Sequence, residues 1–245
     1  MAPQFALPNH LGGLEFKPVS RLGGCETDPA EALQINDNPS ANQVISRSLE
    51  NGCFEYRPGY LTPARAAALG RALGSQVEWQ QEQISMFGRE VWVPRKIAWR
   101  GDRGVCYRYS KKPHVAQGWG RMLKRLKTEI EHSTGARFNY VLMNRYDDGA
   151  SHMGWHSDDE PALGAAPVIA SVSLGGTRRF RVRTKQTAKC ASQPRVSEAF
   201  DLADGSLLIM RGASQQNYQH CLTKTRAKVA ARINLTFRYV HTGDS

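Results

Sequence analysis

The chain has 245 residues, of which 40% are hydrophobic, and this length and composition suit one large domain with its own core. Lys and Arg total 33 against 22 Asp and Glu, so the formal net charge is +11. This excess favours a polyanionic partner such as nucleic acid, although a solvated basic surface without a partner would have the same charge.

Several broad classes are excluded. No apolar run approaches the roughly 18 residues that a membrane-spanning helix needs. The first residues, MAPQFALPNHLGG, lack the basic and apolar regions of a secretory signal. The five cysteines form no C-x-x-C pair, which argues against a disulfide framework or a zinc finger. We therefore expect an intracellular protein in a reducing compartment, without membrane association.

The first elements are expected near residue 53. Residues 1–50 show little apolar periodicity and are interpreted as an irregular arm. Phe54 and Tyr56 alternate as in a short strand. Thr62 suits an N-cap with a proline directly after it, and the pattern predicts a helix through Leu73 with Gly74 as a left-handed cap.

Hairpins and a second helix follow. Residues 77–109 are predicted to form short strands, with turns at Phe87-Gly88 and Gly101-Asp102. A helix is expected over Trp119–His132 and should end at Gly135. Its apolar residues at helical spacing indicate a core-facing side.

From residue 138 onward the pattern indicates strands. The segment 184–197 is polar and is expected to be an exposed loop. Two helices followed by many short strands predict an α+β fold, with helices packed on a β-sandwich or barrel. The expected strands are Phe138–Tyr146, Ile169–Leu174, Arg179–Arg183, Ser206–Met210 and Arg232–Tyr239.

A metal-ligand pattern begins at His156-Ser157-Asp158. Residues i and i+2 of an extended chain point the same way, so an imidazole and a carboxylate would converge. His220 is the best candidate for a third ligand. Two histidines and one carboxylate form the facial triad of non-haem Fe(II) oxygenases, which leaves positions open for a cosubstrate and O2. The alternative is an ordinary core or surface histidine at 220.

The C-terminal strand has two different faces. Ile233, Leu235 and Phe237 alternate with the four polar residues of the segment 232–238, so one face should pack on the core. The other face presents two arginines, an amide and a hydroxyl, which suits a dicarboxylate. Asn144 and Tyr146 share a face of another strand and offer an amide and a phenol. An ordinary half-exposed strand with surface arginines is the alternative.

With these segments in this order, the sequence closely resembles the AlkB family of Fe(II)/2-oxoglutarate dioxygenases. The similarity covers roughly residues 53–240 and is most specific from 139 to 239. The fold that the resemblance implies is a double-stranded β-helix, a jelly-roll pair of sheets with flanking helices. The matching segments are Asn144-Arg145-Tyr146, Trp155–Glu160, Ile169–Gly175, Gly205–Met210, His220 and Arg232–Arg238.

The resemblance also implies roles and a reaction. Iron would be held by His156, Asp158 and His220. With Fe(II) as the cofactor, O2 and 2-oxoglutarate would be consumed in a reaction that yields succinate and CO2 and oxidises an N-methyl group of 1-methyladenine or 3-methylcytosine, from which formaldehyde leaves. The two carboxylates of 2-oxoglutarate would lie on arginines, helped by four polar residues, and this set is Arg232, Arg238, Asn144, Tyr146, Asn234 and Thr236.

Substrate residues follow from similarity to the branch that acts on DNA. The hairpin with Phe87, Gly88 and Arg89 resembles one that pushes an aromatic wedge into duplex DNA. Arg95 is expected to contact a phosphate. Tyr107 and Tyr109 resemble an aromatic pair lining the base pocket. For Phe87 the alternative is a buried hairpin residue, and for the two tyrosines it is core packing.

The two carboxylates after the metal motif would favour a cationic base. Of the pair Asp159-Glu160, Asp159 is the family match, and ordinary surface charge is the alternative. The segments Trp155–Pro161 and Arg211–Gln215 are more similar to a relative that prefers single strands and accepts RNA. The strand preference therefore stays open.

The expected organisation is an arm over residues 1–50, helices and nucleotide-recognition hairpins over 51–137, and the β-helix core over 138–245, with 51–245 as one catalytic domain. The expected partner is DNA, duplex or single-stranded, with RNA open. We expect a monomer, in the nucleus of a eukaryote or the cytoplasm and nucleoid of a bacterium. An RNA demethylase with the same chemistry and an inactive nucleic-acid-binding module are the alternatives. A zinc site is disfavoured because no cysteine falls near the ligands.

Overall fold

The computed structural model describes residues 44–49, 52–86, 88–109, 112–186 and 197–241. The expected arm up to residue 43, the expected wedge residue Phe87 and most of the expected loop over 184–197 lie outside these ranges. Within the described residues, no helix has the length and hydropathy needed to cross a membrane.

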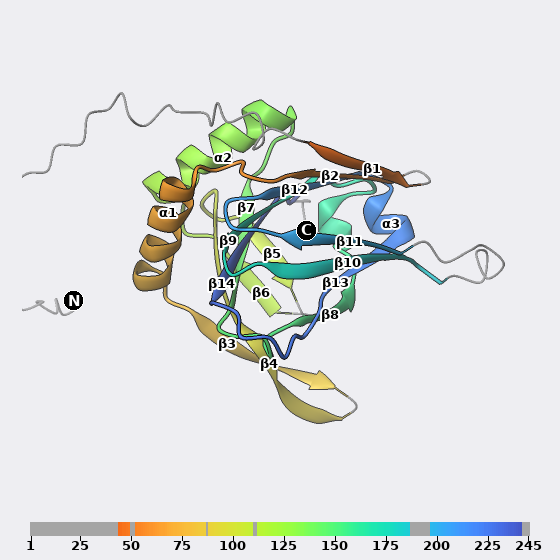
Figure 1. Cartoon of the computed structure of the whole chain (residues 1–245). Coiled ribbons are helices and arrows are strands. Elements are labelled where there is room, and N and C mark those ends of the chain that lie inside the picture. Colours follow the sequence, from red (N-terminus) through yellow and green to blue (C-terminus); the bar gives the residue numbers. More distant parts are fainter. Residues whose placement is uncertain (1–43, 50–51, 87, 110–111, 187–196, 242–245) are drawn as a thin grey trace, which may run out of the picture. The chain divides into compact units, whose positions relative to one another are not determined.

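The larger sheet has eight strands in the order β1-β2-β12-β9-β14-β7-β4-β3 (Figure 1). Strand β14 lies between β9 and β7 and is antiparallel to both, so it is central in the sheet. The strands are β1 (Ile45–Leu49), β2 (Gly52–Arg57), β3 (Gln80–Met86), β4 (Arg89–Gly101), β7 (Tyr140–Tyr146), β9 (Ile169–Gly175), β12 (Leu207–Gly212) and β14 (Arg232–Arg238).

The smaller sheet has four strands in the order β11-β10-β13-β8, and a separate hairpin is formed by β5 and β6. Side chains from both large sheets share one apolar cluster, so the two sheets face each other. This is the jelly-roll arrangement that the resemblance implied. The bounds are β5 (Cys106–Tyr109), β6 (Lys112–Val115), β8 (Met153–His156), β10 (Arg178–Thr184), β11 (Ser197–Leu202), β13 (Tyr218–Leu222), the 3-10 turn η2 (Pro161–Leu163) and the one-turn helix α3 (Ser214–Asn217).

Helix α1 (Pro63–Gln76) begins where the sequence predicted, because the Thr62 hydroxyl accepts the Arg65 N–H at 3.3 Å. The predicted end at Gly74 is wrong. The helix continues to Gln76 and ends at Val77 in extended backbone, whose N–H still reaches the Leu73 carbonyl at 3.3 Å. No left-handed residue is needed at this end.

Helix α2 (Arg121–Thr134) ends as predicted. Gly135 adopts φ 66°, and its N–H donates to the Glu131 carbonyl at 2.9 Å. Leu123, Leu126 and Ile130 form the buried side of the helix. The predicted apolar stripe is therefore confirmed.

Two apolar clusters fix the orientation of β14. One cluster packs α1 and α2 against the outer face of the larger sheet and includes Ile233, Leu235 and Phe237. The other cluster fills the space between the two sheets. Because side chains alternate along a strand, the polar residues of β14 point between the sheets. This orientation provides a wall for a site.

The segment boundaries expected from the sequence differ in two respects from those of the strands that form the larger sheet. Residues Ile45–Leu49, which were assigned to the irregular arm, form β1 and pair with β2. Strands β2 and β4 belong to the same sheet as β12 and β7, so the sheet does not divide at residue 138. Long-range antiparallel pairing thus joins segments that the sequence analysis assigned to separate parts of the chain.

Candidate metal and cosubstrate site

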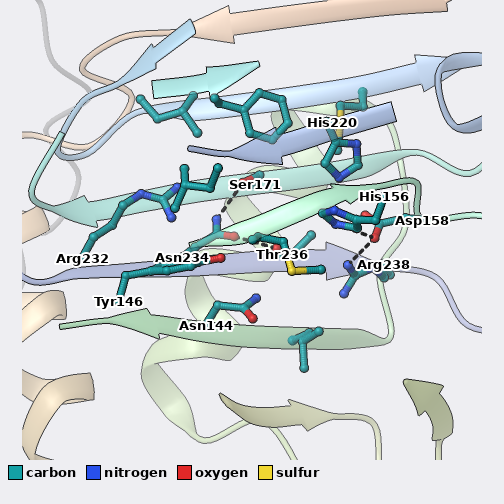
Figure 2. A pocket seen from close by; sticks show the side chains of 16 residues that line it. Asn144, Tyr146, His156, Asp158, Ser171, His220, Arg232, Asn234, Thr236 and Arg238 are labelled. Carbon is teal, nitrogen blue, oxygen red and sulfur yellow. Dashed lines mark hydrogen bonds and ion pairs between the residues drawn. The ribbon is translucent and has the colours of Figure 1, made fainter. Parts of the chain in front are cut away.

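One pocket between the sheets gathers the predicted metal and cosubstrate residues (Figure 2). The polar face of β14 forms one wall, β7 lies beside it, and β8 and β13 contribute from the smaller sheet. All of the following line it: Asn144, Tyr146, His156, Asp158, His220, Arg232, Asn234, Thr236 and Arg238. Residues distant in sequence thus meet at one place.

Strand pairing brings the two histidines together. His156 ends β8 and His220 lies within β13, where the two residues are register partners, and their ring centroids are 4.2 Å apart. The ligand atoms of these histidines and of Asp158 all lie within 4.8 Å of one another. The sequence placed His220 after a strand, whereas it belongs to a strand of its own. That strand has only five residues, and its sequence Tyr-Gln-His-Cys-Leu shows no alternation of apolar and polar residues.

The protonation states of this cluster suit a metal ion. Burial lowers the pKa of His156 and brings that of His220 to about 3, so both imidazoles are neutral near pH 7. Burial alone would raise the pKa of Asp158, but the charge of Arg238, the two histidines and the hydrogen bond from Arg238 together outweigh it and bring the value to about 2. Two neutral imidazoles and an ionised carboxylate are the forms that bind a divalent cation.

The tautomer of His156 is also set by its neighbours. Its Nδ1 lies 2.9 Å from the Gly154 carbonyl oxygen, which can only accept a hydrogen bond. Nδ1 therefore carries the proton, and the lone pair is on Nε2. Nε2 lies 4.0 Å from Oδ1 of Asp158 and therefore faces the other candidate ligands. The donor set fits an Fe(II) facial triad.

The two arginines of β14 are fully buried at opposite ends of its polar face. The Arg232 guanidinium donates from Nη2 to the Ser173 hydroxyl at 2.9 Å and lies 5.4 Å from the Tyr146 ring centroid. Burial lowers its pKa to about 10, which still leaves it charged near pH 7. Arg238 donates from Nη2 to Oδ1 of Asp158 at 2.9 Å. Burial opposes the charge on Arg238, but the Asp158 carboxylate raises its pKa.

The unpaired guanidinium nitrogens in the pocket show whether its residues fit a dicarboxylate. Among the described residues, Nε of Arg232 and both Nε and Nη1 of Arg238 are buried without a hydrogen-bond partner. Buried donors of this kind are costly unless a ligand satisfies them. Between the arginines, the Thr236 hydroxyl donates to Oδ1 of Asn234 at 3.0 Å. A dicarboxylate such as 2-oxoglutarate would pair with these donors.

The structure places Arg95 differently from the sequence expectation. The Pro94-Arg95-Lys96 run indicated a surface contact to phosphate, but Arg95 is only 7% exposed and donates from Nε to Oδ1 of Asn144 at 2.8 Å. Alternation along β4 turns Arg95 toward β7, whereas Lys96 faces out and pairs with Asp147 at 2.9 Å. In this conformation Arg95 supports the pocket wall, and its guanidinium is not presented to a phosphate.

The hairpin residues predicted to contact substrate are only partly described. Gly88 adopts φ 74° in the β3–β4 turn, and the following residue, Arg89, is exposed. Tyr107 is fully buried, with its ring 5.3 Å from that of Tyr140 and 5.4 Å from the Arg238 guanidinium. It therefore packs behind Arg238. The side chain of Tyr109 lies outside the described part of the chain.

The two carboxylates after the metal motif have different environments. Asp159 is exposed and pairs with Nζ of Lys185 at 2.7 Å. Glu160 is half-buried, and its pKa is raised first by burial and then by the charge of Asp158. Sequence reasoning did not identify Gln215, whose amide oxygen accepts the Asp158 N–H at 2.9 Å. Its segment had been noted only for its similarity to a relative.

Comparison with known proteins agrees with this geometry. Residues 54–238 match the family model of the 2OG-Fe(II) oxygenase superfamily. The chain belongs to this superfamily. It is 36% identical over 222 residues to the DNA oxidative demethylase ALKBH2 of Bos taurus, an alignment covering 89% of this chain and 80% of the relative. With ALKBH2 of Homo sapiens the identity is 36% over 181 residues, covering 72% and 69%. These relatives place the chain in the AlkB family.

A second group of relatives has a similar identity. The alpha-ketoglutarate-dependent dioxygenase alkB homolog 3 of Bos taurus is 37% identical over 191 residues, covering 75% of this chain and 65% of the relative. The alignment thus spans just under two thirds of that relative's length. The solved structure of OsALKBH1 superposes with a TM-score of 0.53 at 17% identity, covering 80% of this chain and 100% of that one. That likeness supports the double-stranded β-helix fold.

Proposed function

We propose that this protein removes alkyl groups from N-alkylated bases in DNA, with 1-methyladenine and 3-methylcytosine as substrates, and thereby repairs alkylation damage directly. The observation that carries the proposal is the single pocket that holds a His-Asp-His cluster together with two buried arginines. The oxidative demethylase names of the ALKBH2 relatives point to the same reaction on DNA.

Each side chain of the pocket has a separate role in this proposal. Fe(II) would be held by His156, Asp158 and His220, and with O2 and 2-oxoglutarate it would supply the oxidising power for the N-methyl group. Arg232 and Arg238 would bind the two carboxylates of 2-oxoglutarate. The other polar side chains, Asn144, Tyr146, Asn234 and Thr236, would orient the cosubstrate.

The protein's own contribution is positioning and electrostatics. Arg238 lies between the Asp158 carboxylate and the Tyr107 ring, so a cosubstrate carboxylate on its free nitrogens would lie beside the metal site. The apolar cluster between the sheets excludes water around these charges. The hydroxymethyl group formed on the base is expelled as formaldehyde: its O–H proton is lost, the C–N bond breaks, and the electron pair of that bond returns to the base nitrogen.

The nucleic-acid contacts are expected on the side of the pocket nearest the hairpins. Phe87, Gly88 and Arg89 would engage the strand at the site of a flipped base, and Tyr109 would line the base pocket. Asp159 and Glu160 would favour a cationic base. The net charge of +11 supports a polyanionic substrate. We further propose that residues 51–245 act as one catalytic domain, as a monomer, in the compartment that holds the DNA.

The test is product analysis on matched 1-methyladenine oligonucleotides as single-stranded DNA, duplex DNA and RNA. Formaldehyde release and mass spectrometry of the base would be followed for each. Unmodified adenine should appear with both DNA forms, and their ranking gives the strand preference. Turnover confined to RNA would replace DNA by RNA as the substrate. No turnover on any of the three, with metal bound, would contradict the proposal.

A further inference from the structure

The third metal ligand is not held by a strand. His156 and His220 are paired in the β8–β13 ladder, but β8 ends at His156 and Asp158 follows in irregular backbone before η2. Sheet hydrogen bonds therefore cannot position the Asp158 carboxylate. Some other contact has to fix this backbone if the three ligand atoms are to stay together.

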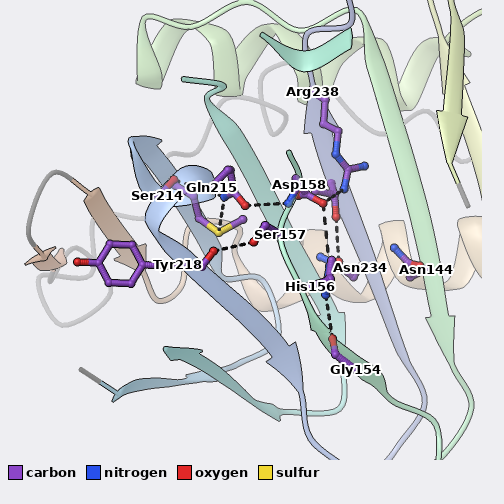
Figure 3. A network of polar contacts seen from close by, with 12 residues as sticks. Asn144, Gly154, His156, Ser157, Asp158, Ser214, Gln215, Tyr218, Asn234 and Arg238 are labelled. Carbon is purple, nitrogen blue, oxygen red and sulfur yellow. Dashed lines mark hydrogen bonds and ion pairs between the residues drawn. The ribbon is translucent and has the colours of Figure 1, made fainter. Parts of the chain in front are cut away.

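Side-chain contacts replace the missing ladder (Figure 3). The Ser157 hydroxyl donates to the Tyr218 carbonyl at 2.8 Å, and the Asp158 N–H donates to Oε1 of Gln215 at 2.9 Å. Lys185 bridges the Asp159 carboxylate and the Gln215 carbonyl, both at 2.7 Å. All of these contacts lead to the α3–β13 segment, which also carries His220.

Gln215 is the buried member of this set. It is 1% exposed, whereas Ser157 and Lys185 are half-buried and Asp159 is exposed. Its amide nitrogen lies 3.4 Å from both the Met210 sulfur and the Ser214 hydroxyl, which keeps the amide oxygen turned to Asp158. A hydrogen bond shielded from water is harder to replace than an exposed one.

We propose that Gln215 is a positioning residue for the metal site, acting by fixing the Asp158 backbone to the segment that carries His220. The inference deepens the proposed function and rests on its metal assignment. The segment 215–220 would supply one ligand, His220, directly. Through the Gln215 side chain it would also hold a second ligand, Asp158, in place. Loss of the amide oxygen leaves the Asp158 N–H buried without an acceptor, so the carboxylate shifts relative to the imidazoles. Changes to groups that orient metal ligands weaken metal affinity about 10–100-fold.

The experiment compares metal binding by the full chain and three variants. Gln215→Met keeps the length of the side chain and removes the acceptor, whereas Gln215→Glu keeps an acceptor oxygen. Gln216→Met is the matched control, because the exposed Gln216 amide donates to the Ala165 carbonyl instead. Co(II) or Mn(II) is titrated by calorimetry, with Trp155, the neighbour of His156, as a fluorescent reporter. Thermal melting of each metal-free protein checks the fold.

The expected result is a Co(II) affinity about 10–100-fold weaker in Gln215→Met, and near wild type in Gln215→Glu and Gln216→Met. Formaldehyde release by Gln215→Met should recover at saturating metal, since no group that contacts substrate is lost. Wild-type affinity in Gln215→Met would overturn the inference, as would equal losses in Gln215→Met and Gln215→Glu. If Gln215→Met fails to fold, Gln215→Asn withdraws the amide by one methylene and should weaken affinity in the same direction.

These titrations contain no nucleic acid, so they do not depend on the substrate. If the metal affinities follow the expected order while no methylated base is repaired, the role of Gln215 stands and the proposed substrate fails. If wild-type protein binds no divalent metal at all, the metal assignment and this inference fail together.

Discussion

Arg238 and Asp158 form a buried ion pair at 2.9 Å, with about 4% and 3% of their side chains exposed. The pair links the polar face of β14 to the proposed iron site, because Arg238 belongs to β14 and Asp158 is a proposed iron ligand. One guanidinium thus neutralises a ligand carboxylate and keeps further donors turned into the pocket.

The first prediction concerns that guanidinium. Arg238→Lys keeps the charge but loses the planar fork, so the KM for 2-oxoglutarate should rise at least about tenfold, a difference of about 1.4 kcal/mol. The measurement is succinate formation against 2-oxoglutarate concentration. Arg179→Lys is the control, since Arg179 is exposed and its side chain pairs with exposed Asp201, away from the pocket residues. An unchanged KM in Arg238→Lys would exclude Arg238 as a cosubstrate anchor.

The second prediction concerns a buried contact between two hairpins. Nε2 of His114, on β6, lies 2.9 Å from Oε1 of Glu82, on β3, and His114 is 2% exposed. His114→Ala leaves the Glu82 carboxylate without this partner and should lower the free energy of unfolding by about 1–3 kcal/mol. Urea denaturation of the variant measures this change in the free energy of unfolding. His132→Ala is the control, because His132 is exposed. Equal stability of the two variants would show that the contact contributes nothing.

The third prediction concerns the start of helix α1. The Thr62 hydroxyl caps the helix by accepting the Arg65 N–H. Thr62→Ala should cost about 1 kcal/mol of unfolding free energy, and Thr62→Ser should restore most of it. Thermal melting separates the two substitutions. If Thr62→Ala melts at the same temperature as the wild type, the Thr62 cap does not stabilise the protein.

The fourth prediction concerns the wedge hairpin. Phe87→Ala should reduce turnover of duplex DNA more than turnover of single-stranded DNA, because only a duplex needs a side chain to fill the gap left by a flipped base. Single-stranded substrate in the same assay is the internal control. Equal losses on both substrates would argue against a wedge.

The fifth prediction concerns charge. With a net charge of +11, binding of DNA should weaken steeply as salt rises, with a linear dependence of log Kd on log salt concentration. Fluorescence anisotropy from about 50 to 200 mM salt measures the slope. A flat response would mean that the basic surface does not contact phosphates.

Alternation and caps made much of the fold predictable. The alternation of Ile233, Leu235 and Phe237 predicted that one face of β14 packs on the core, and the structure confirms this by placing these residues in an apolar cluster with α1 and α2. Thr62 and Gly135 marked helix ends through local hydrogen bonds. Gly74 failed as an end signal because the helix ends in extended backbone that requires no glycine.

Long-range pairing set the limit of the sequence reasoning. Strands β8 and β13 have only four and five residues, so no local periodicity marks them, and the His156–His220 register follows only from their pairing. The inward turn of Arg95 depends on the pairing of β4 with β7, which a basic run in the sequence does not reveal. Gln215 is polar in a loop-like segment and becomes informative only once its contact with Asp158 is known.

The most direct test of the central account is formaldehyde release from single-stranded DNA with 1-methyladenine, comparing the wild type with Asp158→Ala. Release by the wild type should require both Fe(II) and 2-oxoglutarate, and Asp158→Ala should release none while it still binds the oligonucleotide. Formaldehyde release by Asp158→Ala at the wild-type rate, or release that is independent of 2-oxoglutarate, would contradict it.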